Sequence, residues 1–301
     1  MSDEANRLAE ERHERRAAKD FAAADALRDR IRELGFEVKD TPDGFELTPV
    51  EAETEARVAP SDVPSVLEEP ATFGFSVHWV VQGWPEDAVR GIASFRRHHP
   101  EHTVQHVVVD AADTDPSIFP SDVELVALDR DHGWGADRNA GLKRARGEIV
   151  IVIDGSVEPS GDVLTPLQGA LADDSVGIAG PFGIVTDDLR EFRDAEGTEC
   201  DAVEGYLMAF RREILNRAGF FDEKFAFYRT ADIEYSFRVK DQGLRAVVVP
   251  LPLERHEHRM WTATPEEERA RLSKRNFYRF LDRWRGRTDL LVKPPPPTSP
   301  R

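Results

Sequence analysis

An acidic pair, Asp232 and Glu234, opens the predicted helix that follows the aromatic run 225–228 and ends before Gly243. A carboxylate at a helix start, close to Phe and Tyr side chains, is where a transferase places a base against an acceptor hydroxyl. Asp232 is therefore the candidate general base. Because Asp also caps helices well, the alternative role for Asp232 is an N-cap. Glu234 is expected on the solvated side of the helix.

An alternation of strands and helices that begins at Phe73 must position these residues. Apolar strands are predicted at 76–81, 104–110, 123–127 and 148–153, and helices at 86–98, 136–145 and 163–172. Strands separated by helices of this kind indicate an α/β domain with a parallel, doubly wound sheet. Ligands of such sheets bind beyond the carboxyl ends of the strands, where Gln82, Asp110 and Asp154 stand.

Two features of this sheet edge suit a nucleotide. Asp110 ends a strand, where a carboxylate accepts hydrogen bonds from a ribose hydroxyl or a uracil N–H; the alternative is a turn-capping Asp. Gly133 and Gly135 permit close approach of backbone, and the helix start that follows offers free N–H groups to an anion. Arg138 and Asn139 lie in that helix.

In this order, the motifs between residues 74 and 287 strongly resemble family-2 glycosyltransferases, the GT-A fold enzymes that use nucleotide-sugars. The resemblance implies a mixed, mainly parallel GT-A sheet and a nucleoside-diphosphate-sugar donor. It also implies that Asp232 deprotonates an acceptor hydroxyl while the anomeric carbon inverts. The residues it places at the nucleotide are Gln82, Asp110, Arg138, Asn139 and Asp154. The chain departs from the family at Ala231, where the usual acidic pair has Glu.

The family's metal motif, Asp-x-Asp, is changed here to Asp154-x-Ser156. The motif implies Mn²⁺ or Mg²⁺ bound through oxygen, and a hydroxyl is a much poorer ligand for these ions than a carboxylate. Either Ser156 binds the ion weakly, or Glu158 supplies the missing charge, or the protein works with little or no metal. We predict weakened but retained metal binding by Asp154, Ser156 and His256. The spacing from the preceding strand favours His256 over His258.

A second resemblance covers residues 15–48, which closely match the extreme carboxyl-terminal piece of cysteinyl-tRNA synthetases. The match consists of a helix with a Lys-Asp-Phe start, a Leu-Gly turn and a hairpin around Pro42-Asp43-Gly44. None of that enzyme's catalytic motifs is present. Acidic residues interspersed with Arg in the helix argue against tight RNA binding. A docking or packing role is therefore favoured over contact with tRNA.

The predicted organisation has four parts. They are a helix–hairpin module at 1–48 with one helix over 5–34, a linker at 49–72, the GT-A domain at 73–287, and a disordered Pro-rich tail at 288–301.

Composition narrows the function classes. The net charge of −17 argues against a nucleic-acid surface as the main activity, and the single cysteine, Cys200, excludes a disulfide framework. The charged amino terminus is unlike a secretory signal, and no apolar stretch approaches the ~20 residues of a spanning helix, so a cytoplasmic protein is expected. The predicted function is sugar transfer to an unknown glycan, lipid or small-molecule acceptor. The alternatives are a non-catalytic nucleotide-sugar binder or scaffold, and an RNA-associated adaptor that acts through residues 1–48.

Overall fold

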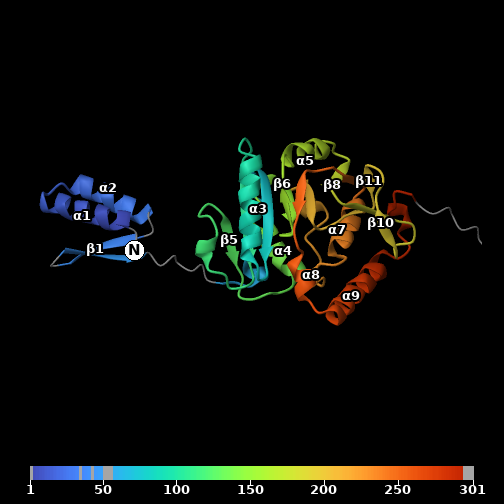
Figure 1. The fold of residues 1–301 in the computed structure, drawn as a ribbon. Helices are drawn as coiled ribbons and strands as arrows, with labels where there is room; N and C mark the ends of the chain where they lie inside the picture. The colour runs from blue at the N-terminus through green and yellow to red at the C-terminus, as the bar shows by residue number, and fades with distance from the viewer. Residues whose placement is uncertain (1–2, 34–35, 42–43, 50–56, 294–301) are drawn as a thin grey trace, which may run out of the picture. The chain divides into compact units, whose positions relative to one another are not determined.

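The computed structural model describes residues 3–33, 36–41, 44–49 and 57–293, which fall into two compact units, Met1–Ala56 and Arg57–Arg301 (Figure 1). Each unit has its own apolar core. In the described part of the chain, no helix has both the length and the apolar character needed to cross a bilayer.

The first unit is a helix hairpin packed on a β-hairpin. Helices α1 (Asp3–Ala17) and α2 (Phe21–Glu33) precede the antiparallel strands β1 (Phe36–Thr41) and β2 (Gly44–Pro49). The single helix predicted over 5–34 is wrong, because Lys19 adopts a left-handed φ of 61° and Asp20 Oδ1 accepts from the Ala23 N–H, starting a new helix. The hairpin turn at 42–43 lies outside the described residues.

The described part of the second unit is built on an eight-stranded sheet in the order β11-β14-β8-β13-β6-β3-β4-β5. The strands are β3 (Phe73–Val81), β4 (Val104–Asp110), β5 (Glu124–Ala127), β6 (Gly147–Ile153), β8 (Val176–Gly180), β11 (Glu199–Cys200), β13 (Leu207–Arg211) and β14 (Arg245–Val248). β13 is antiparallel to both of its neighbours, and β11 is antiparallel to β14, whereas the other pairs are parallel. The mixed, mainly parallel sheet is therefore confirmed.

Alternate side chains of each strand enter opposite cores. On β6, Ile149, Ile151 and Ile153 pack with helices α3 (Pro85–His98) and α5 (Leu164–Leu171), whereas Val150 and Val152 pack toward α4, α7 and α9. The bounds of these last helices are Trp134–Leu142, Ala231–Lys240 and Glu266–Trp284. Smaller elements complete the unit: β7 (Val157–Pro159), β9 (Gly183–Thr186), β10 (Phe192–Asp194), β12 (Ala202–Val203), β15 (Leu253–Arg255), α6 (Ile214–Arg217) and α8 (Arg259–Ala263). Both faces of the sheet are thus covered.

Two segments expected to be irregular pack on the second unit. Residues 57–72 fall within the predicted linker, yet Val63 and Val66 are buried and Val58 bridges to Leu128 beside β5. At the other end, Leu291 is buried in the core around α7 and α9. The remaining linker residues, 50–56, and the tail residues 294–301 lie outside the described residues.

Candidate functional site

The functional edge of the sheet is made where the end of β6 meets the start of β13. Because these strands are antiparallel, Leu207 lies opposite Ile153, and the Asp154 N–H donates to the Tyr206 carbonyl at 3.0 Å. The loop before β13 is thereby held next to Asp154. The first turn of α7 reaches the same place, since the Gly205 N–H donates to Asp232 Oδ2 at 2.8 Å.

A cavity of about 660 Å³ opens at this edge. Its polar lining consists of Asp154, Asp194, Glu204, Asp232, Arg190, Arg229, Thr230 and His258, and its aromatic lining of Trp134, Phe192, Tyr206, Tyr228, Trp261 and Phe277. The structure therefore brings together the two carboxylates that the sequence singled out for different tasks.

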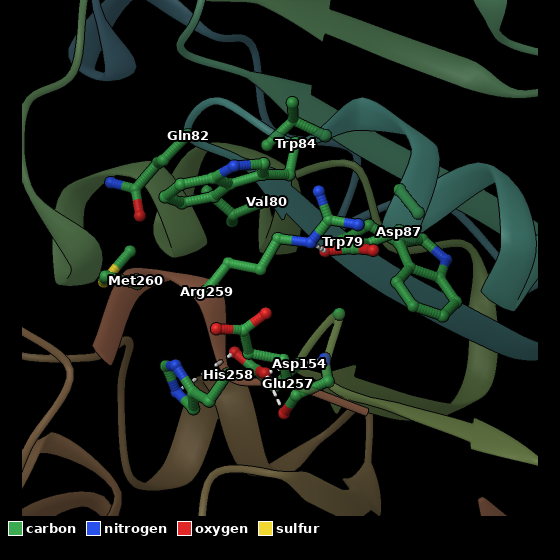
Figure 2. Close-up of a pocket in the computed structure, with 14 residues that line it drawn as sticks. Trp79, Val80, Gln82, Trp84, Asp87, Asp154, Glu257, His258, Arg259 and Met260 are labelled. Atoms are coloured by element: carbon green, nitrogen blue, oxygen red, sulfur yellow. Dashed lines mark hydrogen bonds and ion pairs between the residues drawn. The ribbon is translucent and has the colours of Figure 1, made fainter. Parts of the chain in front are cut away.

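A narrower cleft of about 60 Å³ lies next to this cavity and includes three predicted site residues, Gln82, Asp154 and Ser156. Figure 2 shows the Arg259 side chain reaching across the cleft toward Asp87, and Arg259 Nε lies 3.2 Å from Asp87 Oδ2. Asp154 and His258 line both the cleft and the cavity. They form the shared wall between the two spaces.

Asp154 is held by its neighbour and faces a histidine. Its Oδ1 accepts hydrogen bonds from the Ser156 N–H, at 2.9 Å, and from the Ser156 hydroxyl. Its Oδ2 lies 3.8 Å from His258 Nε2. The Trp261 N–H donates to His258 Nδ1 at 3.2 Å, which places the proton of a neutral ring on Nε2, the side toward Asp154. In this geometry Ser156 orients the carboxylate, and His258 faces its second oxygen without a hydrogen bond of normal length.

The sequence favoured His256 over His258 as a metal ligand next to Asp154, but the structure places His258 there. β15 pairs with β7 so that Glu254 lies opposite Glu158, and His256 Nε2 then lies 3.2 Å from Glu158 Oε1. Arg90 Nε is 3.3 Å from the other oxygen of Glu158. Glu158 therefore already has cationic and imidazole partners, so the geometry does not support the idea that it replaces the missing Asp at position 156.

Asp232 lies in the first turn of α7 and does not cap it. The N-cap position is taken by Thr230, a non-glycine residue with a left-handed φ of 73°. Asp232 Oδ1 accepts from the Ile233 N–H at 2.9 Å, and burial raises the pKa of the carboxyl above its ordinary value. A cavity-facing carboxylate with a raised pKa has the character of a general base.

Glu204 was missed in the sequence, although it lines the same cavity. Burial, together with the nearby charges of Asp232 and Asp194, raises the pKa of Glu204 to about 7. A sequence signal was present, since an acid stands immediately before Gly205 and the apolar strand β13. Nothing local indicated that this acid would share a cavity with Asp232.

Three predicted nucleotide ligands lie buried away from both spaces. Asp110 is 1% exposed and pairs with Arg57 at 2.7 Å, while the N–H and hydroxyl of Thr114 donate to its two oxygens. Arg138 donates to the carbonyls of His78 and Ile153, tying β3 to β6 just before Asp154. Through these contacts, Asp110 and Arg138 stabilise the structure at the sheet edge.

Asn139, the third of these residues, ties α4 to the loop before α7. Its side chain donates to the Phe221 carbonyl at 2.9 Å and accepts from the Phe221 N–H at 3.0 Å. The glycine turn before α4 meets the same loop: the Trp134 and Gly135 N–H groups donate to the carbonyls of Ala226 and Phe225. The expectation that the N–H groups here are free for an anion is therefore wrong for Trp134 and Gly135.

Glu234, expected on a solvated surface, is instead 1% exposed. Its two oxygens pair with Arg238 and Arg283, each at 3.0 Å. Arg283 belongs to α9, so this carboxylate fastens the last long helix to α7. The hydrogen-bonded arginines compensate the cost of burying its charge.

Comparison with known proteins agrees with this architecture. Residues 100–236 match the model of glycosyl transferase family 2. The crystal structure of GalNAc-T7 with UDP, GalNAc and Mn²⁺ aligns with a TM-score of 0.57 and 16% identity, over 70% of this chain and 48% of that one. The mannosyltransferase PcManGT from Pyrobaculum calidifontis, in complex with GDP-Man and Mn²⁺, aligns with a TM-score of 0.51 and 20% identity, over 78% of this chain and 69% of its own.

The first unit has a separate relationship. Residues 1–46 match the cysteinyl-tRNA ligase anticodon binding domain. A stretch of 37 residues is 65% identical to the cysteine–tRNA ligase of Nitratidesulfovibrio vulgaris strain DP4, and it spans 12% of this chain but only 8% of that enzyme. The second unit therefore has a GT-A fold, and residues 100–236 within it match the model of glycosyl transferase family 2.

Proposed function

We propose that the protein transfers a sugar from a nucleoside-diphosphate-sugar to an acceptor hydroxyl, with inversion at the anomeric carbon. The observation that carries this proposal is the cavity shared by Asp154, at the end of β6, and Asp232, at the start of α7. One carboxylate belongs to the donor side of the site and the other to the acceptor side. A transferase needs both kinds of group in one enclosed space.

The cleft and the cavity bind different parts of the substrates. The diphosphate group binds at the mouth of the cleft that contains Gln82, Asp154 and Arg259, and the larger cavity takes the donor sugar and the acceptor. Asp232 accepts the proton of the attacking hydroxyl, and its raised pKa brings its basicity closer to neutral pH. Aromatic side chains such as Tyr206, Tyr228 and Trp261 suit the apolar faces of sugar rings in this cavity.

We infer that a divalent cation takes part. The residues of the shared wall fit such an ion, because Asp154 Oδ2 accepts no hydrogen bond at normal distance from any described residue and faces both spaces. Carboxylate oxygen suits Mn²⁺ and Mg²⁺, which neutralise the charge of a diphosphate leaving group. The two structural relatives were crystallised with Mn²⁺ and with UDP or GDP-Man, which supports the same chemistry here.

Titration of UDP, GDP and dTDP, each with and without Mn²⁺, tests this function by thermal shift and calorimetry. Stabilisation by one nucleotide that increases with Mn²⁺, and that is lost in Asp154→Asn, supports a working donor site and narrows the sugar. No stabilisation by any of the three would contradict the proposal. Binding without turnover across a broad donor panel would favour a non-catalytic nucleotide-sugar binder, which the changes to Ser156 and Ala231 make the chief rival.

For the first unit we propose a docking role. Its match to an anticodon binding domain makes tRNA the competing partner. Salt-sensitive binding of tRNA that disappears when residues 1–48 are deleted would establish RNA contact and overturn the docking role. If tRNA binds weakly and its affinity is the same with and without residues 1–48, docking to another surface is supported.

A further inference from the structure

We propose that Glu257 supplies the second carboxylate of the donor-site cation, in place of the acid that Ser156 lacks. This inference rests on the proposed function, since it concerns the ion of that same site. It identifies a ligand that lies outside the altered Asp-x-Asp motif.

Ser156 already has a partner in Asp154. Its hydroxyl and its N–H both donate to Asp154 Oδ1, so Ser156 stabilises Asp154 and adds no negative charge to the cleft. Only Oδ2 of Asp154 remains directed toward His258, whose Nε2 carries the ring proton in this geometry. A cation at Asp154 therefore needs a second anionic oxygen from another part of the chain.

Glu257 is placed at the same cleft as Asp154. Glu257 lies between the end of β15 and the start of α8, and it lines the cleft together with Asp154. Figure 2 shows the two side chains on the same side of the cleft, with His258 next to them. The His256 N–H donates to the Ser156 carbonyl at 2.7 Å, which holds this turn against the loop that carries Asp154. Glu257 is thereby fixed near Asp154 through the main chain.

The charge of Glu257 distinguishes it from the other acids around the cleft. The other acids around the cleft are already paired with arginine: Glu86 and Asp87 with Arg259, and Glu158 with Arg90. Glu257 makes no ion pair with any residue in the described part of the chain, and its side chain is exposed. It is thus a cleft carboxylate whose charge has no resident partner. Mg²⁺ characteristically binds to one or two carboxylates plus the phosphates of a substrate, which matches Asp154, Glu257 and a diphosphate.

Four variants test the assignment: Glu257→Gln, Ser156→Asp, the double variant, and Glu254→Gln as the control. Glu254 is an exposed glutamate on β15, and it belongs to a separate group with Glu158 and His256 whose ligand atoms lie within 4.8 Å of one another. Mn²⁺ is titrated into the full chain and followed by electron paramagnetic resonance, alone and with UDP or GDP. Unchanged melting temperatures verify that each variant folds.

We expect Glu257→Gln to weaken Mn²⁺ binding about 10-fold or more, and Glu254→Gln to leave it unchanged. Adding Ser156→Asp to Glu257→Gln should restore the affinity, since it returns a carboxylate to the motif. Wild-type affinity in Glu257→Gln, or a loss in Glu254→Gln instead, would overturn the assignment while leaving the proposed function standing. Absence of Mn²⁺ binding by the wild-type chain in the presence of a bound nucleotide would overturn both the assignment and the metal part of the proposed function.

Discussion

The N–H of Gly205 donates a 2.8 Å hydrogen bond to Oδ2 of Asp232, joining the loop before β13 to the first turn of α7. The bond orients the carboxylate at the cavity wall. It also places the preceding residue, Glu204, in the same cavity. The acid–base chemistry proposed for this site therefore depends on a contact between two segments that are distant in the chain.

Asp232→Asn should lower sugar transfer at least about 100-fold, the usual contribution of a general base, and leave nucleotide binding unchanged. The amide keeps an oxygen that accepts from Gly205 but cannot take up a proton. Release of nucleoside diphosphate from the donor identified by titration measures the effect. Asp282→Asn, at an exposed position on α9, is the control. Wild-type turnover in Asp232→Asn would contradict the assigned base.

Glu204→Gln should stabilise the protein at alkaline pH. The pKa of Glu204 is raised to about 7 in the folded chain, so its ionisation opposes folding, and stability from this group falls as pH rises from about 4.5 to about 7. The variant should exceed the wild type by about 2 to 3 kcal/mol at pH 8 and lose this advantage toward pH 4.5. Urea unfolding at several pH values measures the difference. An advantage that is independent of pH, or one shared by the exposed-site variant Glu196→Gln, would contradict the explanation.

His106→Leu should make the protein less sensitive to acid. Burial lowers the pKa of His106 to about 4 and that of His78 to about 3. Between these values and pH 6.5, the two histidines are therefore protonated in the unfolded chain but neutral in the folded chain. Stability from each histidine is present above pH 6.5 and falls by about 1.4 kcal/mol per pH unit below it. Unfolding free energies between pH 7 and pH 5 should therefore show a shallower slope in the variant. The variant His98→Leu, at a half-buried position, serves as the control. Equal slopes in His106→Leu and wild type would refute this assignment.

Arg57→Gln should destabilise the second unit by about 2 to 4 kcal/mol, because it leaves the buried carboxylate of Asp110 without its cationic partner. The partial exposure of Arg57 places the expected cost below that of a fully buried pair. Chemical denaturation measures the loss, with Arg130→Gln, at a largely exposed pair, as the control. A stability equal to that of the wild type would mean that Asp110 is satisfied by its loop hydrogen bonds alone.

The sequence predicted most of the elements that carry the site, because strands and helices are encoded by local periodicity. Strand β4 was predicted with its observed bounds, and β3, β5 and β6 within three residues at either end. The helix break at Lys19 was not predicted, because a single left-handed residue leaves the apolar periodicity of the segment intact. The ordered packing of residues 57–72 was not predicted either, because it depends on partners such as Asp110 that are far away in the chain.

By itself, the sequence determined the order of motifs, and with it the resemblance to a family, the mainly parallel sheet and the candidate roles of Asp154 and Asp232. Only the tertiary structure decided which neighbours these carboxylates have. The register of β15 on β7 brings His256 to Glu158 and leaves His258 beside Asp154. The hydrogen bond from Gly205 likewise brings Glu204 into the cavity of Asp232. Such contacts join segments that are distant in the chain, so no local pattern of residue types encodes them.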